Sequence, residues 1–251
     1  MASLQSVAHP SGSHRYLPAI SPYSAGFAAN PGYAITALEF TQTNSIQEGF
    51  LAIDRELEKR NLPPSALAGL HLRSPGAFSF AAFKEFNDEY NSLLHQRSLI
   101  INGINPISRT NVIPISNGPS QPIIHSAFIV HPTTSVGGKD FVVAGAGEIP
   151  GELDPKNIVA RGDLSPEGMT QKVDCVLTIM NDRLAALGYD GSSPTIVNVY
   201  TVHEIPKLAT RIQSALPSVA KHGFTTWITK PPVEEIEFEM DCNSYSNWVK
   251  I

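Results

Sequence analysis

Two groups of residues in this sequence could carry anion-binding or acid–base chemistry. Arg109 opens a strand-like run that continues to Val112. A guanidinium offers two parallel donors that match a carboxylate, so this arginine could hold an anionic substrate. Near the C-terminus, Glu235, Glu237 and Glu239 alternate with apolar residues, and strand periodicity would place their carboxylates on one face. A glutamate in a half-dry cleft can have a raised pKa and so serve as a base and then as an acid.

Both groups also fit a purely structural role. An arginine at the start of a strand is usually a solvated edge charge, and a ladder of acids is usually the wet side of a sheet. Two further strings place polar groups in otherwise apolar or rigid surroundings. Tyr23 lies between Pro22 and Gly26, and Asn87 precedes Tyr90 by three residues in a helix that is apolar on one face.

Two helix starts stand out among the elements that would position these residues. Ser45 and Glu48 have the spacing of a capping box, and a helical apolar pattern follows until the prolines that begin at residue 63. A second start lies at Ser165, where Pro166 suits the first helical position and Gly188 can close the helix in the left-handed conformation. The two starts lie 120 residues apart.

The elements around these helices follow the same order twice, which predicts two similar units. The first unit has strands at 33–40, 67–72 and 110–115 and helices at 44–62 and 80–94. The second has strands at 141–144, 195–202 and 225–229 and helices at 165–187 and 205–216. Such alternation predicts helices packed on one face of a mixed sheet. We place the units at 1–120 and 121–251, with the boundary in the Gly/Pro-rich stretch between Asn117 and Ser135. A single α/β domain with accidental symmetry is the alternative.

Composition excludes several classes of protein. No run approaches 18 apolar residues, and 18 basic against 23 acidic residues argue against broad binding to nucleic acid or anionic membranes. Cys175 and Cys242 are most simply explained as reduced thiols, so we expect a cytoplasmic protein. The string at 145–151 has the wrong glycine spacing for a dinucleotide loop, and neither the histidines nor the cysteines show the spacing of metal ligands. We therefore expect neither a metal nor an organic cofactor.

The informative strings together resemble the RidA/YjgF family of small imine and enamine deaminases. The resemblance rests on five strings in the family's order, at Ile20–Gly26, Phe86–Tyr90, Ser108–Thr110, Ala146–Pro150 and Glu235–Glu239. It implies an α+β chain of two tandem chorismate-mutase-like domains, each a mixed sheet with two helices on one face. It also implies a homotrimer with clefts between neighbouring domains, in which a small anionic substrate loses ammonia to water.

The same resemblance implies roles for individual residues. Arg109 would clamp a substrate carboxylate, and Glu237 would orient or activate water. The rest of the cleft would be lined by Tyr23, Asn87, Asn111 and Gly147, and Asn111 would offer backbone contacts. The length resembles that of the 2-aminomuconate deaminases of bacterial nitroaromatic and aminophenol breakdown, including a longer type that acts on 2-amino-5-chloromuconate. Such a dicarboxylate would call for a second cation, for which Arg73, Lys221 and His222 are candidates.

Two departures from the family pattern leave alternatives open. Phe224 occupies the arginine position of the second half, and the first half has no closing glutamate strand. Either one composite cleft uses Arg109 and Glu237 together, or the site of one repeat has decayed. The competing functions are a general 2-imino acid deaminase, a chorismate-type hydrolase, and a non-catalytic protein that binds a small carboxylate.

Overall fold

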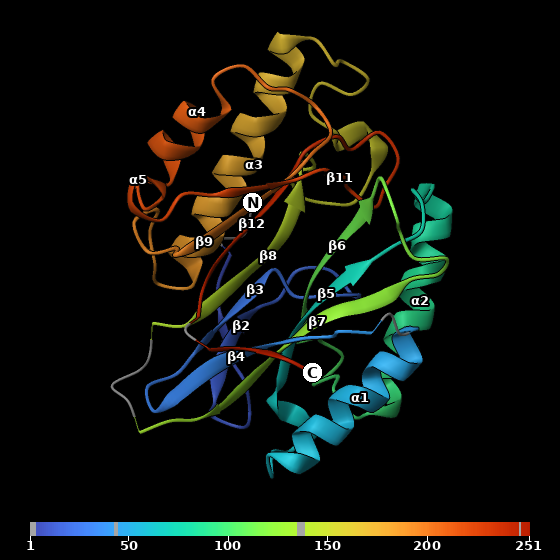
Figure 1. The fold of residues 1–251 in the computed structure, drawn as a ribbon, viewed down its shortest axis with the longest axis vertical. Coiled ribbons are helices and arrows are strands. Elements are labelled where there is room, and N and C mark those ends of the chain that lie inside the picture. Colours follow the sequence, from blue (N-terminus) through green and yellow to red (C-terminus); the bar gives the residue numbers. More distant parts are fainter. Residues whose placement is uncertain (1–3, 43–44, 135–138, 246) are drawn as a thin grey trace.

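The computed structural model describes residues 4–42, 45–134, 139–245 and 247–251, and in these residues the strands form two mixed sheets (Figure 1). The seven-stranded sheet has the order β1 (Val7–Ala8), β2 (His14–Leu17), β3 (Gly26–Ala29), β8 (Phe141–Gly147), β12 (Glu239–Ser244), β9 (Ile196–Tyr200) and β10 (Thr225–Trp227). The six-stranded sheet has the order β11 (Thr229–Lys230), β6 (Ser108–Pro114), β5 (Leu67–Arg73), β7 (Ile123–Pro132), β4 (Tyr33–Glu39) and β13 (Asn247–Lys250).

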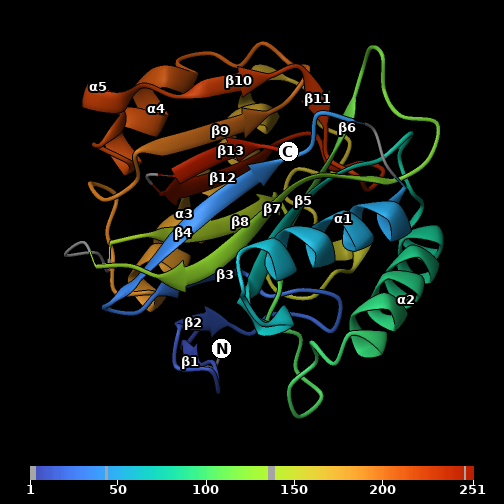
Figure 2. The same cartoon turned by 60° about the horizontal axis from the view of Figure 1, so that its bottom comes forward.

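The helices cover the outer faces of the two sheets. In the views of Figures 1 and 2, α1 (Ile46–Lys59) and α2 (Phe80–Gln96) lie on one side of the strands. On the other side lie α3 (Pro166–Ala186), α4 (Leu208–Ala215) and the single turn α5 (Val219–His222). Short 3-10 turns occur at Pro64–Ala66 and Pro155–Asn157. Within the described ranges, none of the helices has the length and apolarity that crossing a membrane would need.

Local signals in the sequence set the ends of α1 and α3, the two longest helices that the sequence predicts. Ser45 caps α1 through both hydrogen bonds of the capping box: its backbone N–H donates to Oε2 of Glu48, and its Oγ accepts from the backbone N–H of Glu48. Ser165 caps α3 by accepting from the backbone N–H of Gly168, and Pro166 is its first residue. Gly188 follows α3 with a φ of 83°. These helix predictions are confirmed.

Four consecutive strands of each sheet have the same connectivity. In the six-stranded sheet the order is β4-β7-β5-β6, and in the seven-stranded sheet it is β8-β12-β9-β10. In both, the first three strands run antiparallel to their neighbours and the last pair is parallel. The predicted mixed sheets with helices on one face are therefore present.

Strand membership does not follow the expected units 1–120 and 121–251. Strand β7 begins at Ile123 and lies in the six-stranded sheet, as does the C-terminal β13. The N-terminal β1, β2 and β3 lie in the seven-stranded sheet, where β3 pairs with β8. Residues 135–138, at the end of the expected boundary stretch, lie outside the described residues.

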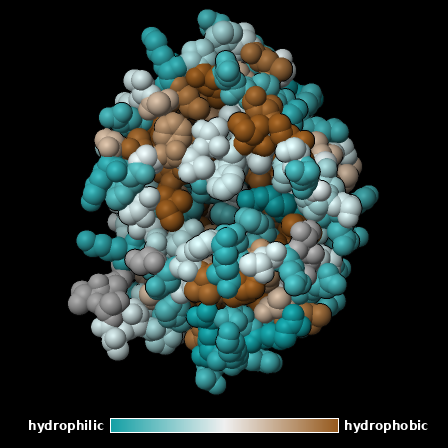
Figure 3. Space-filling view, in the orientation of Figure 1, coloured by the Kyte–Doolittle hydropathy of each residue, from teal (hydrophilic) through white to brown (hydrophobic). Residues whose placement is uncertain are grey.

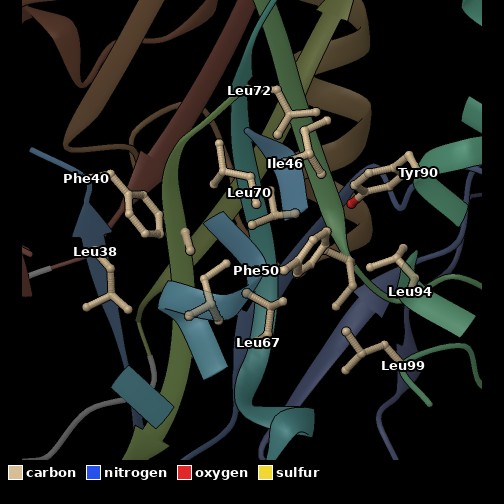
Figure 4. Close-up of a cluster of buried hydrophobic side chains, with 14 of the residues drawn as sticks. Leu38, Phe40, Ile46, Phe50, Leu67, Leu70, Leu72, Tyr90, Leu94 and Leu99 are labelled. Carbon is tan, nitrogen blue, oxygen red and sulfur yellow. The ribbon is translucent and has the colours of Figure 1, made fainter. Parts of the chain in front are cut away.

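Three hydrophobic clusters hold the layers together. The first packs α1 and α2 on the six-stranded sheet; Figure 4 shows Phe50 of α1 among leucines of β5, with Tyr90 and Leu94 of α2 beside them. The second packs α3 and α4 on the seven-stranded sheet. The third lies between the sheets and includes Phe27 and Phe128. Because the side chains of a strand alternate between its two faces, each sheet can be apolar on both sides.

Candidate active site between the two sheets

The guanidinium of Arg109 is buried within a group of aromatic side chains. Arg109 is the second residue of β6, and only 3% of the residue is exposed. Its Cζ atom lies 4.7–5.6 Å from the centres of four rings, those of Tyr23, Phe83, Phe86 and Tyr90. Aromatic faces attract a cation, but they do not accept the hydrogen bonds of its N–H groups in the way that a carboxylate does.

Most of the hydrogen-bonding capacity of Arg109 is unused. Its Nη2 donates to Oδ1 of Asn87 at 2.7 Å, while Nε and Nη1 are buried and have no partner among the described residues. No described carboxylate forms an ion pair with it. A buried donor without an acceptor costs about 1–3 kcal/mol, and more when it is charged. Nε and Nη1 are therefore free to donate to an anion.

A cavity of about 110 Å³ opens beside Arg109, between the two sheets. Of the residues expected at the site from the sequence, the cavity is lined by Tyr23, Arg109, Asn111 and Gly147. Asn87 reaches the site through its bond to Arg109. Strand β6 of one sheet and strands β8 and β12 of the other contribute to the lining, so the cavity is shared by both halves of the chain.

The expected ladder of three glutamates is broken in the structure, and its carboxylates do not share a face. Glu235 has a φ of 67°, and β12 begins only at Glu239, so strand alternation does not extend back through this segment. Glu235 pairs with Arg161 at the surface. Oε2 of Glu237 lies 2.8 Å from Nε2 of His203, and Glu237 is not among the residues that line the cavity.

Glu239 is the glutamate that lines the cavity together with Arg109. It is 6% exposed. Burial, with a smaller contribution from the negative charge of Asp241, raises the pKa of Glu239 to about 8. A Cβ at Gly145 would collide with Oε1 of Glu239 and lie 2.8 Å from Cγ2 of Thr110, so any side chain at this position would displace the carboxyl group of Glu239.

A second arginine, which the sequence analysis missed, also lines the cavity. Arg183 lies on α3 and is half-buried, and its Nη1 donates to the carbonyl oxygens of Ala144 at 2.8 Å and Gly145 at 3.3 Å. Burial lowers its pKa. A signal was present in the sequence, because position 183 follows Val176 by seven residues and Met180 by three. A charge at that spacing falls on the apolar stripe of the helix.

The three candidates for a second cation named from the sequence do not line the cavity. Arg73 is half-buried and donates to the carbonyl oxygen of Leu72. Lys221 and His222 are exposed at the end of α5. The side chain of Asn111 is engaged by Ser74, with hydrogen bonds of 2.9 and 3.1 Å in the two directions. A backbone role for Asn111 stays a prediction.

A buried ion pair positions the segment that leads to Glu239. Nζ of Lys172 lies 3.2 Å from Oε1 of Glu148, and both side chains are fully buried. Glu148 also accepts the backbone N–H groups of Glu237 and Phe238, at 2.8 and 3.1 Å. The pair therefore joins the end of β8 to the start of β12. In the described part of the chain, no group of three or more His, Cys, Asp or Glu side chains is arranged to hold a metal ion.

Comparison with known proteins gives one family and one likeness of fold. The model of the family described as 2-aminomuconate deaminase CnbZ matches residues 6–248. A 2-amino-5-chloromuconate deaminase from Comamonas testosteroni is 36% identical over 239 residues, which cover 92% of each chain. A chorismatase structure matches 96% of this chain and 79% of its own, with a TM-score of 0.50 and 12% identity, and shows a likeness of fold alone. A putative endoribonuclease from Thermotoga maritima matches 53% of this chain and 91% of its own at a TM-score of 0.31 and 18% identity, too low to support an argument.

Proposed function

Because this chain belongs to the 2-aminomuconate deaminase family CnbZ, we propose that it is a cofactor-free hydrolytic deaminase of 2-aminomuconate or its 5-chloro derivative. It would convert the enamine to the 2-oxo acid and ammonia during the bacterial breakdown of nitroaromatic compounds and aminophenols. The observation that carries the proposal is the unpaired guanidinium of Arg109, which shares one cavity with the protonatable Glu239. We therefore give the acid–base role expected of Glu237 to Glu239.

In the proposed complex, Arg109 binds the carboxylate next to the carbon that carries nitrogen. Its free Nε and Nη1 groups would donate to the carboxylate oxygens, while Asn87 holds Nη2 in place. Charge-assisted bonds of this kind fix both position and orientation. The substrate is thereby held with its C–N bond near Glu239, which approaches from β12.

The raised pKa of Glu239 sets the order of proton transfers. Near neutral pH its carboxyl group is mostly neutral. Glu239 first donates its proton to the enamine carbon next to the one that carries nitrogen. The C–N bond thereby becomes the C=N bond of an iminium. The resulting carboxylate takes a proton from water as the water oxygen bonds to the C=N carbon. Glu239 then passes this proton to nitrogen, the C–N bond breaks, ammonia leaves, and the adduct hydroxyl returns its proton to Glu239 as the carbonyl forms.

This order predicts how the rate depends on pH. We expect kcat/KM for the enamine to be level below about pH 8 and then to fall about tenfold per pH unit, because the proton needed for the first step is lost. Ammonia release measured between pH 6 and 9.5 at low substrate concentration tests this. A rate that instead rises through pH 8 would mean that the carboxylate acts first, and would contradict the proposed order.

The function itself is tested with two kinds of substrate. The purified protein should release ammonia from 2-aminomuconate much faster than from 2-iminobutanoate generated freshly from an amino acid. Equal rates on both would favour a general 2-imino acid deaminase. Binding of muconate analogues without turnover of any enamine or imine would refute catalysis and leave a carboxylate-binding protein.

The matching connectivity of the two sheets supports a further part of the proposal, that the chain is a duplicated RidA/YjgF-type unit which assembles as a homotrimer. Exposed large apolar side chains include Trp227 at the end of β10, Ile228 directly after it, and Trp248 on β13, at edges of the two sheets. On the face drawn in Figure 3, hydrophobic residues gather in patches toward the upper half. Patches of this kind are common at protein interfaces.

Light scattering at micromolar concentration should give about three times the chain mass of 27.1 kDa. Replacing Trp227 and Trp248 together by serine should lower that mass while the protein stays folded by circular dichroism. A wild-type monomer would contradict the proposed assembly.

A further inference from the structure

The cavity is lined by two arginines and one carboxyl group, so its positive and negative groups are not balanced. Arg109 and Arg183 line it, and neither forms an ion pair with a described carboxylate. Among the described residues of the lining, Glu239 is the only acidic one, and it is mostly neutral near pH 7. The side chains of the lining therefore carry about two positive charges, on a chain whose net charge is −5. A partly dry site with two unpaired cations best fits a ligand with two negative charges.

Resting on the proposed function, we propose that Arg183 binds the second carboxylate of the substrate, so that the cavity selects short linear dicarboxylates over monocarboxylates. The two guanidinium groups would then hold the two ends of one molecule. The carbon that reacts would lie between them, within reach of Glu239.

The placement of Arg183 suits this role. Its Nη1 is anchored to the carbonyl oxygens of Ala144 and Gly145, while Nε and Nη2 make no hydrogen bond to another described residue. The anchor comes from β8 and the side chain from α3, whereas Arg109 comes from β6 of the other sheet. Arg109, Arg183 and Glu239 line the same cavity, and both positive charges lower the pKa of Glu239 against the larger effect of its burial.

A purely structural role would not require these features. A single uncharged N–H donor group could form the hydrogen bonds to the carbonyl oxygens of Ala144 and Gly145. Such a neutral group would also avoid the free-energy cost of placing an unpaired cation in a half-buried position. Arg211 provides a contrast on the same side of the molecule. Its Nη1 lies 2.8 and 2.9 Å from the two carboxylate oxygens of Asp174, and it does not line the cavity.

The experiment uses two inert probes of the same chain length and calorimetry. cis,cis-Muconate has two carboxylates and sorbate has one, and neither carries nitrogen that could be released. The wild type should bind muconate more tightly than sorbate. Arg183→Met should weaken muconate binding by about 10- to 100-fold, the effect of losing a charged hydrogen-bonded contact, and leave sorbate binding within about twofold. Arg183→Lys, which keeps the charge, should recover part of the loss, and the matched control Arg211→Met should bind both probes as the wild type does.

The outcomes separate this inference from the proposed function. Selective loss of muconate binding in Arg183→Met supports a second carboxylate site, whether or not the wild type turns over 2-aminomuconate. Unchanged muconate binding, or an equal loss for both probes, overturns it, and the wild-type ammonia assay still decides the proposed function. Near-ultraviolet circular dichroism of Arg183→Met shows whether β8 keeps its packing, and the Arg183→Lys variant repeats the test with a donor and a charge in place.

Discussion

Arg109→Met is expected to lower kcat/KM for 2-aminomuconate by at least about 10³-fold while the protein remains folded. The change removes the proposed bidentate contact to the substrate carboxylate and with it the orientation of the C–N bond toward Glu239, and charge-assisted binding and positioning each contribute several kcal/mol in enzymes. The variant should be no less stable than the wild type, because a methionine fits among four aromatic rings and removes a buried cation with two unsatisfied nitrogens.

Ammonia release and thermal melting measured on the same preparation test this prediction. Arg109→Lys is the informative companion, because it keeps the charge and loses the planar pair of donors. We expect it to retain less than about a tenth of the activity. Arg211→Met, in which another arginine is lost away from the cavity, should keep normal turnover. An Arg109→Met protein that is folded and fully active would remove the central residue of the proposed site.

The features of the fold that the sequence predicts correctly are mostly those that depend on residues close together in the chain. The capping box at Ser45 and the proline start of α3 depend on residues within one turn, and both occur as predicted. The strands at β5, β6 and β9 follow from short runs of β-branched and apolar residues. The sequence did not predict which sheet holds β7, β13 and the N-terminal strands. These strands pair with partners that are distant in the chain, and no local signal encodes such pairing.

The residues of the candidate site could be predicted less well, because their positions depend on contacts between distant parts of the chain. The alternation at Glu235–Glu239 looked like a strand, but buried Glu148, 89 residues away in sequence, accepts the backbone N–H groups of Glu237 and Phe238, and the chain turns at Glu235. Glu239 rather than Glu237 therefore reaches the cavity. Arg183 lies on the apolar stripe of α3 by its spacing from Val176 and Met180, but that spacing predicts burial alone and not which cavity the side chain lines.

Glu239→Gln is expected to make the protein more stable than the wild type, by an amount that grows as the pH rises from about 4.5 to about 8. In the folded protein this carboxyl group keeps its proton up to a pKa of about 8, whereas in the unfolded chain it ionises near its ordinary value of 4.5. Between these values the folded state binds more protons, so its free energy of unfolding falls with rising pH. Each pKa unit corresponds to about 1.36 kcal/mol, which makes the full effect a few kcal/mol. The neutral glutamine avoids this cost at every pH.

Urea denaturation of both proteins at pH 5, 7 and 9 measures the difference, which should be small at pH 5 and largest at pH 9. The same variant should lose about 10²- to 10⁴-fold in kcat, the usual contribution of general acid–base catalysis. Glu237→Gln is the matched control, because its carboxylate lies beside His203, outside the cavity, with 19% of the side chain exposed. It should show neither the pH-dependent gain nor the loss of turnover. If Glu237→Gln rather than Glu239→Gln abolished turnover, the acid–base group would have to be sought next to His203 instead of opposite Arg109.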